Sequence, residues 1–266
     1  MYQLATREQV PALLAYFEKD LKNCLYSYID LKKYGIDNPH LHIYYSSKDG
    51  EITAVATEYY KGIQLFSYGE TLDIGETLEL IERLETPMIN GKQELIELLE
   101  THLGTDFEKE TGFVAWMKEL KPGADISKVE RAGEEKCLEI ATLICTDEGL
   151  GGHYVPEEFC QQLVDRQREA FGRNYVLYRD GKIACHAATY AEIENLAIVS
   201  GVIADATYRG QGLGYQVVSG ICHDLLAEGK RPCIFYFKKE AAGLYAKVGF
   251  EDGTGWGKLS RRKKED

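Results

Sequence analysis

Two successive blocks of strand-like and helix-like hydrophobic patterns run along the chain. In the second block, apolar residues alternate with polar ones as in half-buried strands, and elsewhere they recur every three or four positions as in helices. The expected elements are, in order, a strand at 125–132, helices at 133–145 and from Pro156 to Phe171, strands at 174–180, 182–191 and 193–205, a helix at 212–228, a strand at 232–237, a helix at 238–249 and an irregular strand or hairpin at 250–259. This pattern predicts a mixed α+β fold with a mostly antiparallel sheet flanked by helices.

The first block shows a similar order of patterns. Its expected elements are strands at 41–46, 51–60 and 62–68, a helix at 75–84, a strand at 87–90, a helix at 91–103 and a strand at 111–119. Between the blocks, Pro122 and Gly123 favour a loop. We therefore predict two tandem domains, 1–123 and 124–266, and leave open whether the first is a diverged copy of the second or an unrelated α+β domain.

The charge balance narrows the choice of partners. The net charge is −12, and the first 124 residues carry 12 Lys and Arg against 21 Asp and Glu, whereas the remainder carries 19 against 22. Nucleic acids and anionic membranes need a basic face, so neither is expected as a partner. A polyphosphate ligand should prefer the second half, and the acidic first half favours a cationic small molecule. A homodimer is compatible with the sequence.

Targeting signals and metal motifs are not apparent. The N-terminus lacks the basic start and apolar block of a signal peptide, and no apolar run approaches the roughly 20 residues of a membrane span, so we expect a cytoplasmic protein. The seven cysteines are scattered and fit neither a disulfide framework nor a CxxC metal site. His40 and His42 would share one strand face without an evident third ligand, so no metal is predicted.

A glycine-bearing loop, "YRGQGLG" at 208–214, joins the third strand of the second block to a helix. The N-terminus of a helix presents free N–H groups and partial positive charge, so this loop predicts an anion site, with phosphate as the natural ligand. A Walker loop is excluded because Gly214 is followed by Tyr215 and Gln216 instead of Lys and Ser or Thr. The dinucleotide fingerprint also fails, because the spacing is GxGxG and the next strand ends without an acidic residue.

The remaining pattern, Arg-x-x-Gly-x-Gly from Arg209 to Gly214, resembles the loop of the GNAT superfamily of acyl-CoA-dependent N-acetyltransferases. The segment "AAGLYAKVGF" at 241–250 is similar to a second segment of that family and lies in the expected order behind the loop. The resemblance covers 125–260. One departure is Lys238, where the family often has Asn.

The resemblance implies acetyl-CoA as cosubstrate and assigns its binding residues. The backbone amides of the loop would hold the pyrophosphate, with Arg209 and Gly210 shaping the turn, and the preceding strand would pair with the pantetheine arm through its main chain. The predicted residues are Val202, Ile203, Ala204, Arg209, Gly210, Gln211, Gly212, Leu213 and Gly214.

The implied reaction is transfer of an acetyl group to a primary amine of a small molecule or peptide by direct attack in a ternary complex. Tyr245 matches the general acid of the family, since a phenol is protonated at neutral pH and can donate to a departing thiolate. Glu192 and Glu194 are the candidates for the general base. His153 and His186 are left out of the catalytic set, since a lone histidine on a strand, such as His186, is more often structural. The alternative function is a non-catalytic CoA-binding sensor or pseudoenzyme.

The first half has its own counterpart of the loop if it is a diverged copy. This is "GETLDIG" at 69–75, in which Glu70 and Asp73 would stand where phosphates bind and would repel CoA. We therefore expect a degenerate first domain.

Overall fold

The computed structural model describes residues 1–60, 62–68, 72–148, 150–151, 154–237 and 239–262. The chain divides into two compact units: Met1–Val114 with Gly253–Asp266, and Ala115–Asp252. The boundary expected near residue 123 therefore lies inside the second unit. The segment 253–266, which we expected in the second domain, belongs to the first.

The C-terminal strand accounts for this difference. β12 (Phe250–Arg261) begins in the second unit and pairs antiparallel with β5 (Met88–Lys92) of the first, with Trp256 opposite Lys92 and Ser260 opposite Met88. Trp256 and Leu259 are buried in this sheet. Hydrophobic alternation identifies such a strand, but it does not say which neighbour the strand pairs with.

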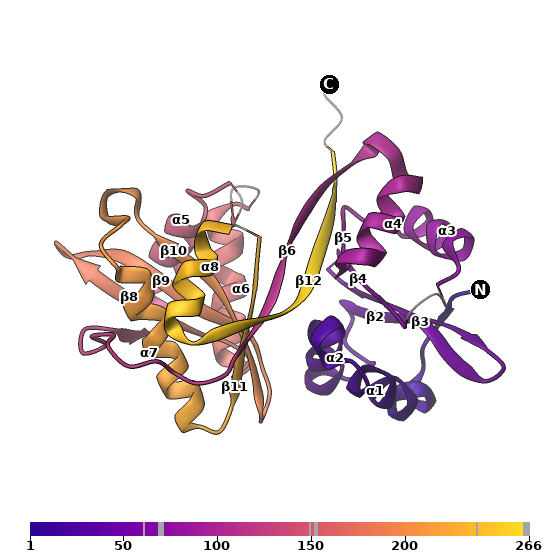
Figure 1. Cartoon of the computed structure of the whole chain (residues 1–266), viewed down its shortest axis with the longest axis horizontal. Coiled ribbons are helices and arrows are strands. Elements are labelled where there is room, and N and C mark those ends of the chain that lie inside the picture. Colours follow the sequence, from indigo (N-terminus) through magenta and orange to yellow (C-terminus); the bar gives the residue numbers. More distant parts are fainter. Residues whose placement is uncertain (61, 69–71, 149, 152–153, 238, 263–266) are drawn as a thin grey trace. The chain divides into compact units, whose positions relative to one another are not determined.

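The first unit is a sheet with helices on both faces (Figure 1), in the strand order β1-β2-β3-β4-β5-β12-β6. Its remaining elements are β1 (Gln3–Leu4), η1 (Arg7–Gln9), α1 (Val10–Glu18), α2 (Leu21–Tyr34), β2 (Leu41–Lys48), β3 (Glu51–Tyr59), β4 (Gly62–Ser67), α3 (Ile74–Leu84), α4 (Gln93–Leu103), η3 (Gly104–Asp106) and β6 (Phe107–Met117). α1 and α2 cover one face, and α3 and α4 the other. The elements from β2 onward were predicted, whereas α1 and α2 were not.

The second unit has the strand order β6-β11-β10-β9-β8-β7. Its elements are β7 (Glu130–Ala132), η4 (Glu134–Lys136), α5 (Cys137–Ile144), α6 (Pro156–Arg168), β8 (Arg173–Arg179), β9 (Lys182–Glu192), β10 (Leu196–Ala204), η5 (Ala206–Tyr208), α7 (Leu213–Ala227), β11 (Arg231–Tyr236) and α8 (Lys239–Val248). α5 and α6 pack on one face of the sheet and α7 and α8 on the other (Figure 1). The predicted meander of three strands, followed by loop and helix, is confirmed.

The two units share one internal pattern. In each, a parallel ladder of four pairs surrounds a crossover helix: Gly62–Leu65 pairs with Met88–Gly91 around α3, and Leu196–Val199 pairs with Arg231–Ile234 around α7. The same register in both halves supports a diverged copy. The units differ beyond the ladder, where β10 continues to Ala204 but β4 ends at Ser67.

Candidate active site

The parallel strands β10 and β11 separate next to the glycine loop. Their last register pair in the described part of the chain is Val199 with Ile234, although β10 runs on to Ala204. On its other edge this end of β10 still pairs with β9, through Ile203 and Ala204. Among the described residues, backbone groups of 200–204 that point away from β9 therefore have no strand partner, and they can pair with an extended ligand.

A β-bulge shapes this end of β10. The register with β9 shifts between Ser200 and Ile203, and Gly201 has φ of +60°. A Cβ atom at Gly201 would lie 2.5 Å from the Tyr190 hydroxyl, and this contact together with the positive φ favours glycine. Bulges turn backbone groups out of the regular ladder, and they are frequent beside active sites.

His186 supports the bulge from behind. This residue is fully buried on β9, with Nδ1 2.7 Å from Gly201 O and Nε2 3.0 Å from the Asn174 side chain. Burial lowers the pKa of His186 to about 4, so the ring is neutral near pH 7. A neutral ring has one N–H; Nδ1 carries it when it donates to Gly201 O, which can only accept, and Nε2 then faces the side-chain amide of Asn174, whose Oδ1 lies 3.0 Å away. His186 is thus a structural residue, as interpreted from the sequence.

The glycine loop leads directly into α7. Gly210 and Gly212 have φ of +78° and +76°, a region that favours glycine, and Gly212 is the N-cap of the helix. No side chain of the described residues caps this helix end. The amides of Leu213 and Gly214 belong to the first turn and have no partner within the helix. The geometry fits the anion site that the sequence predicts.

The side chain of Arg209 and the close approach of Leu244 to Gly214 shape this loop. Arg209 Nε donates to Ala204 O at 3.2 Å, and its guanidinium lies 3.8 Å from the Asp147 carboxylate. A Cβ at Gly214 would approach a Leu244 methyl group to 3.3 Å, so glycine lets α8 lie close to the start of α7. Gln211 is exposed, which suits a role through its backbone alone.

Tyr245 lies in the hydrophobic cluster that joins these parts. Its ring packs on Tyr236 and Phe250, with centroid distances of 5.1 and 6.1 Å. Val202 and Ala204 pack against the same cluster, whereas Ile203 points to the opposite face of the sheet. Burial raises the pKa of Tyr245 far above its ordinary value near 10, so the phenol stays protonated. Among the described residues its hydroxyl has no hydrogen-bond partner.

The geometry argues against Glu192 as the general base. Glu192 is 5% exposed and accepts two hydrogen bonds from Arg173, at 2.7 and 2.6 Å. Lys230 Nζ is 3.3 Å away, and the Thr189 hydroxyl also donates to this carboxylate. Glu192 pairs with Ala197 at the start of β10, roughly 20 Å of extended strand from the loop. The carboxylate is therefore part of a buried ion cluster.

Glu194 is also remote from the loop. It is exposed in the turn between β9 and β10, at the same far end as Glu192. Glu192 and Glu194 precede β10, whereas the glycine loop follows it, so both carboxylates lie at the end of the strand opposite to the loop. Neither predicted base is therefore close to the loop. His153, Lys238 and Glu70 lie outside the described residues.

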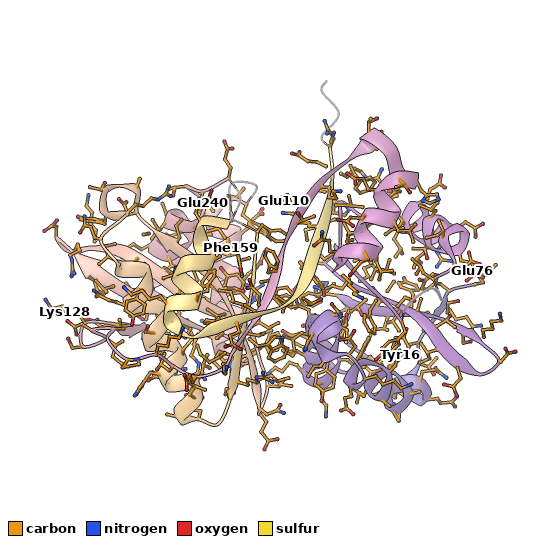
Figure 2. The ribbon with its side chains drawn as sticks, viewed as in Figure 1. Tyr16, Glu76, Glu110, Lys128, Phe159 and Glu240 are labelled. Atoms are coloured by element: carbon orange, nitrogen blue, oxygen red, sulfur yellow. The ribbon has the colours of Figure 1, made fainter. Side chains whose placement is uncertain are left out.

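The segment between α5 and α6 contributes aromatic surface on the other face of the sheet. Tyr154 stacks on Phe159 of α6, labelled in Figure 2, with centroids 4.9 Å apart. Phe159 in turn packs edge-on against Tyr190 of β9. Ile203 belongs to the same cluster, so this aromatic group lies on the reverse side of the bulged strand.

Gly201 and Asn174 are features of the site that sequence reasoning missed. A glycine inside an otherwise regular strand pattern is a signal for a bulge, and Gly201 stood in such a pattern. Asn174 gave no comparable signal, because its role depends on the side chain opposite it on β9.

Comparisons with known proteins agree with this geometry. Residues 137–250 match the model of the acetyltransferase (GNAT) family. A GCN5-related N-acetyltransferase from Sphaerobacter thermophilus superposes with a TM-score of 0.65 at 13% identity, covering 100% of this chain and 97% of that one. A tandem GNAT protein from the clavulanic acid biosynthesis pathway gives 0.60 at 12%, covering 100% and 99%.

A GCN5-related N-acetyltransferase-like protein from Streptococcus suis gives 0.59 at 15% identity, covering 97% of this chain and 100% of that one. No curated protein sequence matches the chain. No helix within the described residues has the length and apolar character to cross a membrane. Residues 137–250 of this chain therefore match the model of the acetyltransferase (GNAT) family, and the whole chain shares its fold with a tandem GNAT protein.

Proposed function

We propose that this protein transfers an acetyl group from acetyl-CoA to a primary amine of a small, cationic molecule. Members of the GNAT family use acetyl-CoA. The observation that carries the proposal is the separation of β10 from β11 beside an uncapped helix N-terminus. The free strand edge suits an amide-containing arm, and the N-terminus of α7 suits the pyrophosphate.

In the proposed reaction, the amine nitrogen attacks the thioester carbonyl directly, the C–S bond breaks, and the thiolate takes up a proton. A free backbone N–H of the bulged strand would stabilise the oxyanion, because a fixed main-chain donor needs no reorganisation. Tyr245 would donate the proton to the thiolate, since its unpaired phenol stays protonated.

Deprotonation of the amine is assigned to solvent. Glu192 is held by Arg173 and Glu194 is remote, so neither provides a base for the attack. The attacking species is then the neutral fraction of the acceptor amine, and the rate should rise with pH until that amine is deprotonated.

The test is release of free CoA thiol from acetyl-CoA across a panel of primary amines, with CoA binding measured in parallel by calorimetry. Turnover on at least one amine is expected. Measurable CoA binding without turnover on any amine would contradict the proposal and leave the second candidate, a CoA-binding pseudoenzyme, which the remote positions of Glu192 and Glu194 favour.

Tyr245→Phe separates the two candidates. For an enzyme with Tyr245 as acid, the variant should lose roughly 100-fold or more in turnover while CoA affinity stays nearly unchanged. Equal losses of CoA binding and thermal stability would instead identify Tyr245 as a packing residue.

A further inference from the structure

A cavity lies wholly within the first unit, and none of its lining residues belongs to the proposed acetyl-transfer site of the second unit. It has a volume of about 700 Å³ and is formed by the C-terminal turns of α3 and α4 with parts of β6 and β12. Cavities of this size hold small organic molecules in many proteins. Nothing in the proposed acetyl transfer uses this cavity.

The floor of the cavity is apolar. Ile81 and Phe107 are 3% and 5% exposed, and Leu78 and Leu103 are partly buried beside them. These four side chains come from α3, α4 and β6. Such a floor favours a ligand with an aliphatic or aromatic body.

Negative charge lines one part of the rim. Glu82, Glu85 and Asp106 contribute three carboxylates, and the C-terminal ends of α3 and α4 add partial negative charge. Within the described part of the chain, no ion pair joins these carboxylates to a basic side chain. An ammonium group on a ligand would find several acceptors there.

Positive charge is fixed at another part of the rim. The Arg261 guanidinium lies 4.7 Å from the centroid of the Phe107 ring, and its Nε donates to Thr86 O at 3.3 Å. Two contacts therefore hold the side chain, while its two terminal amino groups have no partner among the described residues. A guanidinium held in this way is suited to a carboxylate.

We propose that this cavity binds a zwitterion, namely a free α-amino acid with an apolar side chain. The ligand carboxylate would pair with Arg261, the ammonium group with the carboxylates of Glu82, Glu85 and Asp106, and the side chain would cover the apolar floor. Carboxylates and a guanidinium that line one cavity, and that form no ion pair with each other among the described residues, match the charge distribution of this class of molecule.

The first experiment measures binding of three related probes to the full chain by calorimetry. L-phenylalanine carries both charges, 2-phenylethylamine lacks the carboxylate, and 3-phenylpropanoate lacks the ammonium group. We expect L-phenylalanine to bind with a dissociation constant of roughly 1 mM or lower, and each analogue to bind about tenfold more weakly. Absence of L-phenylalanine binding at that concentration, or equal affinity for 2-phenylethylamine, would overturn the proposal.

The second experiment locates the bound probe. Arg261→Gln and Glu82→Gln should each weaken L-phenylalanine binding roughly five- to tenfold. Arg262→Gln and Glu79→Gln are matched controls on the same strand end and the same helix, outside the cavity lining, and should have no effect. Equal effects of variant and control would contradict the assignment.

A third variant keeps this site distinct from the acetyl-transfer site. Gly212→Asp changes only the glycine loop of the second unit, so L-phenylalanine should bind it as it binds the unaltered protein. Loss of binding in this variant would show that the amino acid occupies the acetyl-transfer site and would refute the proposal, whatever the outcome of the turnover assay.

Discussion

The buried His186 should make the stability of the protein depend on pH between 7 and 5. Burial lowers its pKa to about 4, against an ordinary value of about 6.5. As the pH falls below 6.5, the unfolded chain takes up a proton at this site while the folded chain does not, so stability is lost. From these two pKa values, His186 alone removes about 2 kcal/mol between pH 7 and pH 5.

The variant His186→Gln tests this value, because glutamine keeps an N–H donor for Gly201 O but does not titrate. Urea unfolding at pH 7 and pH 5 gives, for each protein, the change in the free energy of unfolding between the two pH values. The contributions of all carboxylates cancel when this change is compared between the two proteins. The variant should lose about 2 kcal/mol less than the original protein over this range. An identical pH dependence for the original protein and His186→Gln would refute the reasoning.

Three further predictions concern the loop, the ion cluster and the reaction. Gly212→Asp should abolish CoA binding through bulk, backbone strain and like charge, whereas Gln211→Ala should leave it nearly unchanged; both affinities are measured by calorimetry. Glu192→Gln should destabilise the protein by roughly 2 kcal/mol in urea unfolding, because Arg173 loses one buried carboxylate partner and keeps the other, Glu228, whereas the exposed Glu194→Gln should cost little. The value of kcat/KM should increase with pH, and the inflection of this profile should follow the pKa of each acceptor amine. An inflection that stays near pH 6 for all amines would point to a protein base instead.

Local patterns in the sequence were sufficient for most elements and for the loop. The spacing of apolar residues identified α7, and two glycines with positive φ lie where the loop pattern requires them. Pairing between distant segments could not be predicted in the same way, because hydrophobic alternation is the same whichever neighbour a strand finds. β12 was therefore assigned to its nearest block, although its register partner is β5.

Side-chain roles that depend on partners were also beyond the sequence. Glu192 was selected because it precedes the strand that leads to the loop. Its carboxylate is instead held by Arg173, which lies 19 residues earlier on β8. The helices α1 and α2 were missed although Pro11 stands in the first turn of α1, where proline favours a helix start.

The two crossover helices differ in how their N-termini are capped. The N-terminus of α3 is capped by the chain itself, since Asp73 Oδ1 accepts a hydrogen bond from the amide of Glu76 at 3.0 Å. The N-terminus of α7 has Gly212 at the equivalent position and no side-chain cap. A carboxylate satisfies the same amides and the same partial charge that would otherwise attract a phosphate. In the first unit, the carboxylate of Asp73 therefore occupies the helix N-terminus at which the second unit would bind a phosphate. This difference supports a single CoA site per chain.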